Sequence, residues 1–229
     1  MKLSLVVPCL NEEENVQKFY NTVKDTFNGL IKNYEIVFVN DGSTDKTGEN
    51  LEKIFNEDSS RVQVLTFSRN FGKEAAIYAG LSNAKGELVC IIDADLQQHP
   101  SVVVEMLKIM SEDASVDCVA AYQENRKENA FMSGVKSAFY KIINKVAEVN
   151  FVNGASDFRL MKRTMVDAVI SMSERHRFSK GIFSWVGFNT KYILYEVNER
   201  EFGETKWTFG KLLKYALDGI ISFSTFPSP

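Results

Sequence analysis

The sequence predicts an α/β fold with a mostly parallel central sheet flanked by helices. Through the first half of the chain, short apolar stretches alternate with longer amphipathic ones, which is typical of buried parallel strands joined by helices. Each of the first four apolar stretches is also followed directly by polar or charged residues. Ligands in such sheets bind beyond the carboxyl ends of the strands, so these residues predict a binding site at one sheet edge.

Five strands and four helices are expected in this half. The apolar stretches LSLVVP, EIVFVN, VQVLTFS, LVCIID and DCVAAY predict strands over 3–8, 35–40, 62–68, 88–93 and 117–122. Helix-like stretches lie between them near 12–30, 45–57, 73–83 and 101–111. The polar residues after the first four strands are PCLNEEEN, NDGSTD, SRNFG and DADLQQHP.

The second half has a different pattern. Apolar residues recur at helical spacing from Phe131 to Val146, and a turn-like NGASD follows over 153–157. Residues 209–223 form another apolar stripe at helical spacing, flanked by lysines. This amphipathic segment suits either a core helix or a helix lying in a membrane interface.

Composition indicates a soluble globular protein. The 229 residues are enough for one large domain, or for a domain with an appendage. A formal charge of −3 gives no support to nucleic-acid binding. Residues 1–121 carry 11 Lys and Arg against 19 Asp and Glu, whereas residues 122–182 carry 11 against 6. The basic stretch indicates either an anionic partner on one side or a solvated basic face.

Several protein classes lack their signatures here. Neither G-x-G-x-x-G nor G-x-x-x-x-G-K-[ST] is present, which argues against a dinucleotide-binding oxidoreductase and a P-loop NTPase. G-x-S-x-G and H-E-x-x-H are missing as well. Cys9, Cys90 and Cys118 have no metal-ligand spacing and are expected to be buried, reduced thiols. The first residues do not suit a signal peptide, and no run of 18 apolar residues occurs.

Asp93 and Asp95 are the strongest candidates for chemistry. They end an apolar strand with only Ala94 between them, and a charge there is costly unless something pairs with it. In extended backbone, residues i and i+2 point to the same side, so both carboxylates can bind one hard divalent cation. The alternative is that one aspartate only caps the helix that follows Pro100.

Together these stretches carry a family resemblance. LSLVVPCLNEEEN, VNDGSTDKT, SRNFGKEAA and DADLQQHP are similar to family 2 glycosyltransferases with the GT-A nucleotide-sugar-binding fold. GASDFRLMKR, FSKGIFSWVGF, EREFGETKW and ALDGIISFSTFP resemble the polyprenyl-phosphate branch, which includes dolichyl-phosphate mannose synthases and bactoprenol glucosyltransferases. The resemblance implies a catalytic domain over 1–205, with a nucleotide-sugar half (1–122) and an acceptor half (123–205). An amphipathic juxtamembrane helix over 206–229 would precede transmembrane helices outside this chain.

The resemblance also implies donor-side roles. Asp95 and Asp93 would hold Mg²⁺ or Mn²⁺ against the donor diphosphate, with Gln97 beside them. The nucleotide would be bound by the residues Pro8, Asn11, Glu13, Asp41, Arg69 and, as a weaker candidate, Lys73. The diphosphate would be gripped by a loop with Arg200, Thr205 and Lys206. Each of these residues also has a structural role as its alternative. Asp41 could stabilise a turn, Glu13 could interact with the helix dipole, Arg69 could form a surface ion pair, and 200–206 could be a solvated charged loop.

On the acceptor side the resemblance makes Asp157 a catalytic residue. A lipid phosphate monoester has a second pKa near 6, so it needs little deprotonation at pH 7, and Asp157 would then orient the acceptor. A sugar-hydroxyl acceptor would instead need a true general base. A turn-stabilising role is the structural alternative for Asp157. The lipid phosphate is assigned to basic candidates in the second half, namely Arg126, Lys127, Arg177 and Lys180.

The expected activity is therefore that of an inverting, metal-dependent hexosyltransferase. It would use a UDP-glucose or GDP-mannose type donor and a polyprenyl phosphate acceptor at the cytoplasmic face of a membrane. A family 2 enzyme acting on a glycan hydroxyl is one alternative, and a non-catalytic nucleotide-sugar sensor is another. The sugar, the metal, the lipid length and the formation of a homo-oligomer are left open by the sequence.

Overall fold

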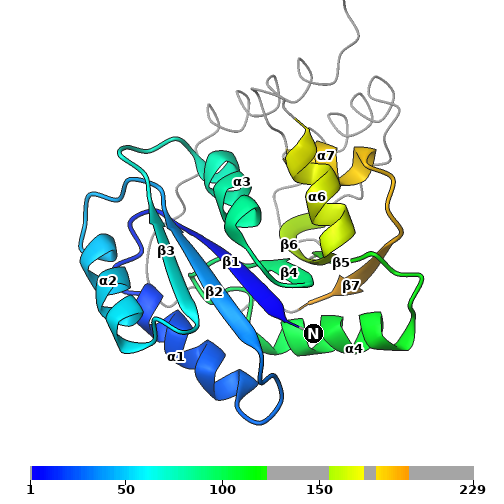
Figure 1. Cartoon of the computed structure of the whole chain (residues 1–229), viewed down its shortest axis with the longest axis horizontal. Helices are drawn as coiled ribbons and strands as arrows, with labels where there is room; N and C mark the ends of the chain where they lie inside the picture. Colours follow the sequence, from blue (N-terminus) through cyan, green and yellow to red (C-terminus); the bar gives the residue numbers. More distant parts are fainter. Residues whose placement is uncertain (1, 123–154, 173–178, 196–229) are drawn as a thin grey trace, which may run out of the picture.

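The computed structural model describes residues 2–122, 155–172 and 179–195 (Figure 1). The strands are β1 (Leu3–Cys9), β2 (Tyr34–Asn40), β3 (Val62–Thr66), β4 (Leu88–Ile91), β5 (Cys118–Tyr122), β6 (Ala155–Lys162) and β7 (Thr190–Leu194). The helices are α1 (Val16–Phe27), α2 (Thr47–Glu57), α3 (Lys73–Asn83), α4 (Ser101–Glu112), α6 (Arg163–Ser171) and α7 (Ser179–Trp185). The five predicted strands and four predicted helices of the first half are confirmed.

The strands form one sheet in the order β3-β2-β1-β4-β6-β5-β7. The first four in this order pair in parallel, as predicted. Strand β6 runs antiparallel between β4 and β5, and β7 pairs in parallel with β5. The sheet is therefore mostly parallel but mixed, with one inserted strand that was not predicted.

The turn predicted over 153–157 is wrong for residues 155–157, because they form the start of β6. From Asp157 onward, residues of this strand alternate between two faces. Phe158 and Leu160 belong to one apolar cluster, and Met161 belongs to the other. This period of two is the pattern of a strand with both faces covered.

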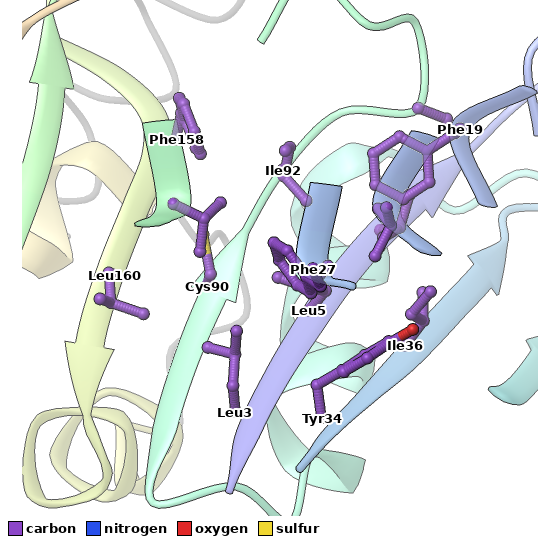
Figure 2. Packing of buried hydrophobic residues seen from close by; sticks show 14 of the residues in the cluster. Leu3, Leu5, Phe19, Phe27, Tyr34, Ile36, Cys90, Ile92, Phe158 and Leu160 are labelled. Carbon is purple, nitrogen blue, oxygen red and sulfur yellow. The ribbon is translucent and has the colours of Figure 1, made fainter. Parts of the chain in front are cut away.

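Helices cover both faces of the sheet (Figure 1), and an apolar core on each face holds them there. The first core packs α1, α2 and α4 on one face, and Figure 2 shows part of it, including Leu5, Phe19 and Ile36. The second core packs α3, α6 and α7 on the opposite face. Each large apolar side chain that is fully buried there contributes roughly 2 kcal/mol to stability. The three cysteines are free and buried, as predicted.

Some predictions lie outside the described residues. They include the helix expected from Phe131 to Val146, the amphipathic segment over 206–229 and the domain boundary at 205. Among the helices of the described ranges, none has both the length and the apolar character needed to cross a membrane.

Candidate active site

The polar ends of neighbouring strands meet in one pocket. It has a volume of about 240 Å³ and lies beyond the carboxyl ends of β1, β2 and β4. Its lining consists of Pro8, Cys9, Leu10, Glu12, Asp41, Lys73, Ala76, Asp93, Ala94 and Asp95. The sequence predicted that the polar strand ends meet at this edge of the sheet, and their position there is confirmed.

Asp93 and Asp95 both line this pocket, although the backbone is not extended through them as predicted. Strand β4 ends at Ile91, Asp95 lies in a turn, and Leu96 has a positive φ of 56°. A leucine in that region is uncommon and costs free energy. The two carboxylates therefore reach the pocket because the chain turns after β4, and not because residues alternate along an extended strand.

Hydrogen bonds within the same loop hold the two aspartates. The N–H of Asp93 donates to Oε1 of Gln98 at 3.1 Å, and the N–H of Gln97 donates to Oδ1 of Asp95 at 3.1 Å. At the start of α4, the N–H of Ser101 donates to Nδ1 of His99 at 3.2 Å, and the N–H groups of Val102 and Val103 donate to the carbonyl oxygens of His99 and Pro100. These N–H groups have partners other than Asp93 and Asp95, so the alternative in which an aspartate caps this helix is wrong.

Asp41 joins two loops at the pocket wall. Its side chain is 2% exposed and accepts hydrogen bonds from the N–H groups of Phe71 at 2.7 Å and Gly72 at 3.0 Å. A Cβ on Gly42, whose φ is 65°, would lie 2.2 Å from the carbonyl carbon of Arg69. The loop after β2 therefore packs directly on the loop after β3, and Asp41 fixes the start of α3.

Asp157 reaches the same place from the antiparallel strand. The register of β4 and β6 pairs Ile91 with Arg159, so two residues further on it sets Asp157 across from Asp93. The ammonium of Lys73 lies 2.8 Å from Oδ1 of Asp93 and 3.3 Å from Oδ2 of Asp157. Lys73 thus bridges the aspartate after β4 and the aspartate of β6.

Charge interactions at this bridge shift the pKa of Lys73. Desolvation favours the neutral amine, but the carboxylates of Asp93 and Asp157 outweigh it and raise the pKa of Lys73 above its usual value. Lys73 is therefore a cation at pH 7. Burial, and then the charges of Glu12 and Asp93, raise the pKa of the Cys9 thiol. This thiol stays protonated at pH 7 and is no nucleophile.

The other predicted donor-site residues occupy different positions. Asn11 has a φ of 52° and accepts a hydrogen bond from the N–H of Thr44 at 2.9 Å. Glu13 accepts one from the N–H of Lys46 at 2.9 Å, so it braces the loop after β2 and not the first turn of α1. Arg69 is exposed, with its guanidinium 4.1 Å from the centre of the Phe71 ring.

Of the predicted residues, the structure brings together Pro8, Asp41, Asp93 and Asp95 in the pocket lining. Gln97 lies in the same loop as Asp95, and its backbone N–H is bonded to it. Arg126, Lys127, Arg177, Arg200, Thr205 and Lys206 lie outside the described residues. Lys180 lies in α7, and its side chain is outside the described part.

Three features of this site were missed from the sequence. Glu12 lines the pocket and Gln98 braces Asp93, but the prediction chose their neighbours Glu13 and Gln97. Lys73 was assigned to the nucleotide edge, whereas it contacts Asp93 and Asp157. The alternation of polar and apolar residues in Asp157–Lys162 was a signal for strand β6. The strand with which β6 pairs, however, depends on tertiary structure.

Comparison with known proteins identifies the family. The family model described as Glycosyl transferase family 2 matches residues 4–170. The chain belongs to glycosyl transferase family 2. The prophage bactoprenol glucosyl transferase homolog of Escherichia coli (strain K12) is 43% identical over an alignment of 230 residues that covers 99% of this chain and 74% of that protein. The bactoprenol glucosyl transferase of Shigella phage SfV is 41% identical over 228 residues, 99% of this chain and 73% of that protein.

Solved structures agree on the fold. Glucosyl-3-phosphoglycerate synthase from Mycobacterium tuberculosis, in complex with Mn²⁺, UDP and glucosyl-3-phosphoglycerate, aligns with a TM-score of 0.63 at 16% identity, over 99% of this chain and 81% of that chain. The mannosyltransferase PcManGT from Pyrobaculum calidifontis, in complex with GDP-Man and Mn²⁺, aligns with a TM-score of 0.59 at 17% identity. The alignment covers 87% of this chain and 58% of that chain. This family 2 glycosyltransferase has the GT-A fold that the sequence predicted.

Proposed function

We propose that this glycosyltransferase moves a hexose from a nucleotide sugar to a polyprenyl phosphate, with inversion at the sugar C1 and with a divalent metal. The observation that carries the proposal is the meeting of Asp93, Asp95 and Asp157 at the ends of β4 and β6. The polyprenyl acceptor is supported by the names of two relatives, a bactoprenol glucosyl transferase homolog at 43% identity and a bactoprenol glucosyl transferase at 41% identity.

The pocket fits a metal that is bound together with its substrate. Among the described residues, no group of three or more His, Cys, Asp and Glu side chains is arranged to hold a metal ion. Asp93 and Asp95 supply two carboxylates at one wall. Mg²⁺ is commonly held by one or two carboxylates plus substrate phosphates and water, so the donor diphosphate would complete the coordination of Mg²⁺ or Mn²⁺. Such an ion would neutralise the negative charge of the departing nucleoside diphosphate.

The chain's own residues would position the two substrates. Asp41 and Pro8 line the pocket and would bind the donor there, and we place Asn11, Glu13, Arg69 and Gln97 around the nucleotide as supporting residues. An oxygen of the lipid phosphate attacks C1 as the bond from C1 to the diphosphate oxygen breaks. The diphosphate leaves with that electron pair. The basic residues of 122–206 would neutralise the two phosphate groups.

Asp157 would orient the acceptor in this reaction. The Asp157 side chain is 16% exposed and shares the Lys73 ammonium with Asp93. A lipid phosphate is already mostly ionised at pH 7, so it does not need a base. A glycan hydroxyl would need Asp157 as a general base instead. The two acceptors are separated by the product: a labelled sugar extracted with the lipid into organic solvent, or a labelled glycan that stays in water.

The place of action follows from the proposed acceptor. A polyprenyl phosphate is held in a bilayer, whereas nucleotide sugars are soluble and charged, so the enzyme would work at the cytoplasmic face of a membrane. Flotation of the chain with vesicles that contain undecaprenyl phosphate tests this placement. A chain that stays with the soluble fraction under turnover conditions would contradict it.

The acidic pair gives the central test. Asp95→Asn and Asp93→Asn should each lower turnover of UDP-glucose and undecaprenyl phosphate by about 100-fold or more, because stabilisation of the leaving group is lost. The measurement is transfer of labelled glucose to lipid with Mn²⁺. Lys108→Met is the control, because Lys108 is exposed on α4 and pairs only weakly with Glu112 at 3.8 Å. Full activity of both asparagine variants would overturn the proposal, and donor binding without turnover on any acceptor would favour a sensor.

A further inference from the structure

The position of Lys73 is unusual for a lysine. It is the first residue of α3, where the helix dipole disfavours a cation and favours an anion. Phe71 and Gly72, which precede it, are hydrogen-bonded to the buried carboxylate of Asp41. The start of the helix is therefore fixed by the fold, and the lysine must be stabilised by something else.

The stabilising groups are carboxylates. Among the described residues that line the pocket, Lys73 is the sole basic one, whereas Glu12, Asp41, Asp93 and Asp95 are acidic. The Lys73 ammonium lies 2.8 Å from Asp93 and 3.3 Å from Asp157. Among the lining residues that the structure describes, this ammonium supplies the positive charge that faces the carboxylates.

From this arrangement we infer that Lys73 is a resident counter-cation that bridges Asp93 and Asp157 in the metal-free protein and competes with a divalent cation for Asp93. The inference rests on the proposed function, since Asp93 is there a metal ligand. It makes Lys73 a positioning residue that couples cation binding on the donor side to the placement of Asp157 on the acceptor side.

A competing role has a consequence that a purely structural role lacks. Removing a positive charge beside a cation site strengthens cation binding, because two like charges repel across a few ångströms. A lysine that served only to hold the pocket together would weaken cation binding when it is removed. The sign of the change in metal affinity therefore separates the two roles.

The test is Mn²⁺ binding to the purified chain without nucleotide, measured from the signal of free Mn²⁺ in electron paramagnetic resonance. Lys73→Met should bind Mn²⁺ about tenfold more tightly than wild type, although its sugar transfer falls. Lys73→Arg keeps the charge and should bind within about twofold of wild type. Lys108→Met removes an exposed charge on α4 and should also bind within about twofold.

Thermal unfolding supplies a second readout. In EDTA, Lys73→Met should melt below wild type, and its gain in melting temperature on adding Mn²⁺ should exceed that of wild type. Should Lys73→Met fail to fold, Lys73→Gln keeps a polar head group and gives the same two measurements. Equal or weaker Mn²⁺ binding by a folded variant would overturn the inference and leave the proposed function standing. Wild type that binds no Mn²⁺, with or without UDP, would contradict both.

Discussion

At the residue scale, Asp41 shows how one buried carboxylate serves both structure and site. It lines the pocket, and its oxygens accept hydrogen bonds from two backbone N–H groups of the next loop. The family resemblance singled out Asp41 as a nucleotide-pocket residue, and Asp41 does line the pocket, whereas a turn role was the alternative. Its bond to a loop 30 residues later could not be predicted, since only the folded chain brings Phe71 to it.

A change at Asp41 should therefore affect stability as well as binding. In Asp41→Asn, the amide keeps one acceptor oxygen and presents an NH₂ group to two N–H donors. We expect the free energy of unfolding to fall by about 1–3 kcal/mol, and donor affinity to fall with it, because α3 loses its fixed start. Urea unfolding measures the first effect. Asp25→Asn, at an exposed position of α1, is the control, and equal stability of the two variants would show that the Asp41 bonds contribute little.

At the scale of elements, helix α3 links the site to the sheet. It carries Lys73 at its first residue and packs on β1 through Gly80. A Cβ at Gly80 would lie 2.3 Å from Cγ1 of Val6 and 3.3 Å from Cγ2 of Val39. The sequence predicted this helix with its correct ends, but the reason for its glycine is the close approach to β1, which helical periodicity does not reveal.

The variant Gly80→Ala tests this close approach. Alanine favours a helix by about 1 kcal/mol over glycine, but overpacking against β1 costs about 1–3 kcal/mol, so we expect a net loss of stability and of activity. Val6→Ala removes the atom that would clash. The double variant Val6→Ala with Gly80→Ala should then be more stable than the sum of the single effects implies. Strict additivity in urea unfolding would show that α3 has room to move.

Strand β6 shows what local sequence leaves undetermined. Asp157 was a candidate from the resemblance, yet it was expected in a turn and lies in a strand. Its position across from Asp93 depends on the antiparallel pairing of β6 with β4. No feature of residues 155–162 specifies that partner, because both faces of the strand are covered and its pairing is decided by the rest of the sheet.

At the scale of the whole molecule, the parallel half of the sheet was predictable and the mixed half was not. Strands β1 to β4 are mostly apolar stretches that are followed by polar residues, so both their type and the edge that carries the site follow from local pattern. The order β4-β6-β5 places a late strand between two earlier ones. That insertion depends on contacts between distant parts of the sequence, and it brings Asp157 of β6 within 3.3 Å of Lys73, which lines the pocket.

The buried thiols make the stability of the whole molecule depend on pH. Burial, followed by the neighbouring Cys118, raises the pKa of Cys90. Burial also raises the pKa of Cys118, against smaller opposing effects of Arg159 and Thr190. In the unfolded chain both thiols would ionise near pH 8.5. The folded state therefore retains protons that the unfolded state releases, and stability should be complete below about pH 8.5 and decline above it.

We expect this decline to approach about 1.4 kcal/mol per pH unit for each thiol. Urea unfolding between about pH 8 and 9.5 measures it, below the range near 10 where tyrosines ionise. A variant with Cys90→Ala and Cys118→Ala is less stable at pH 7 because two buried side chains are shortened, but its stability should fall less steeply over the same range. If the slopes of the two proteins are equal, the decline comes from other groups, and the protonated state of these thiols contributes nothing to the fold.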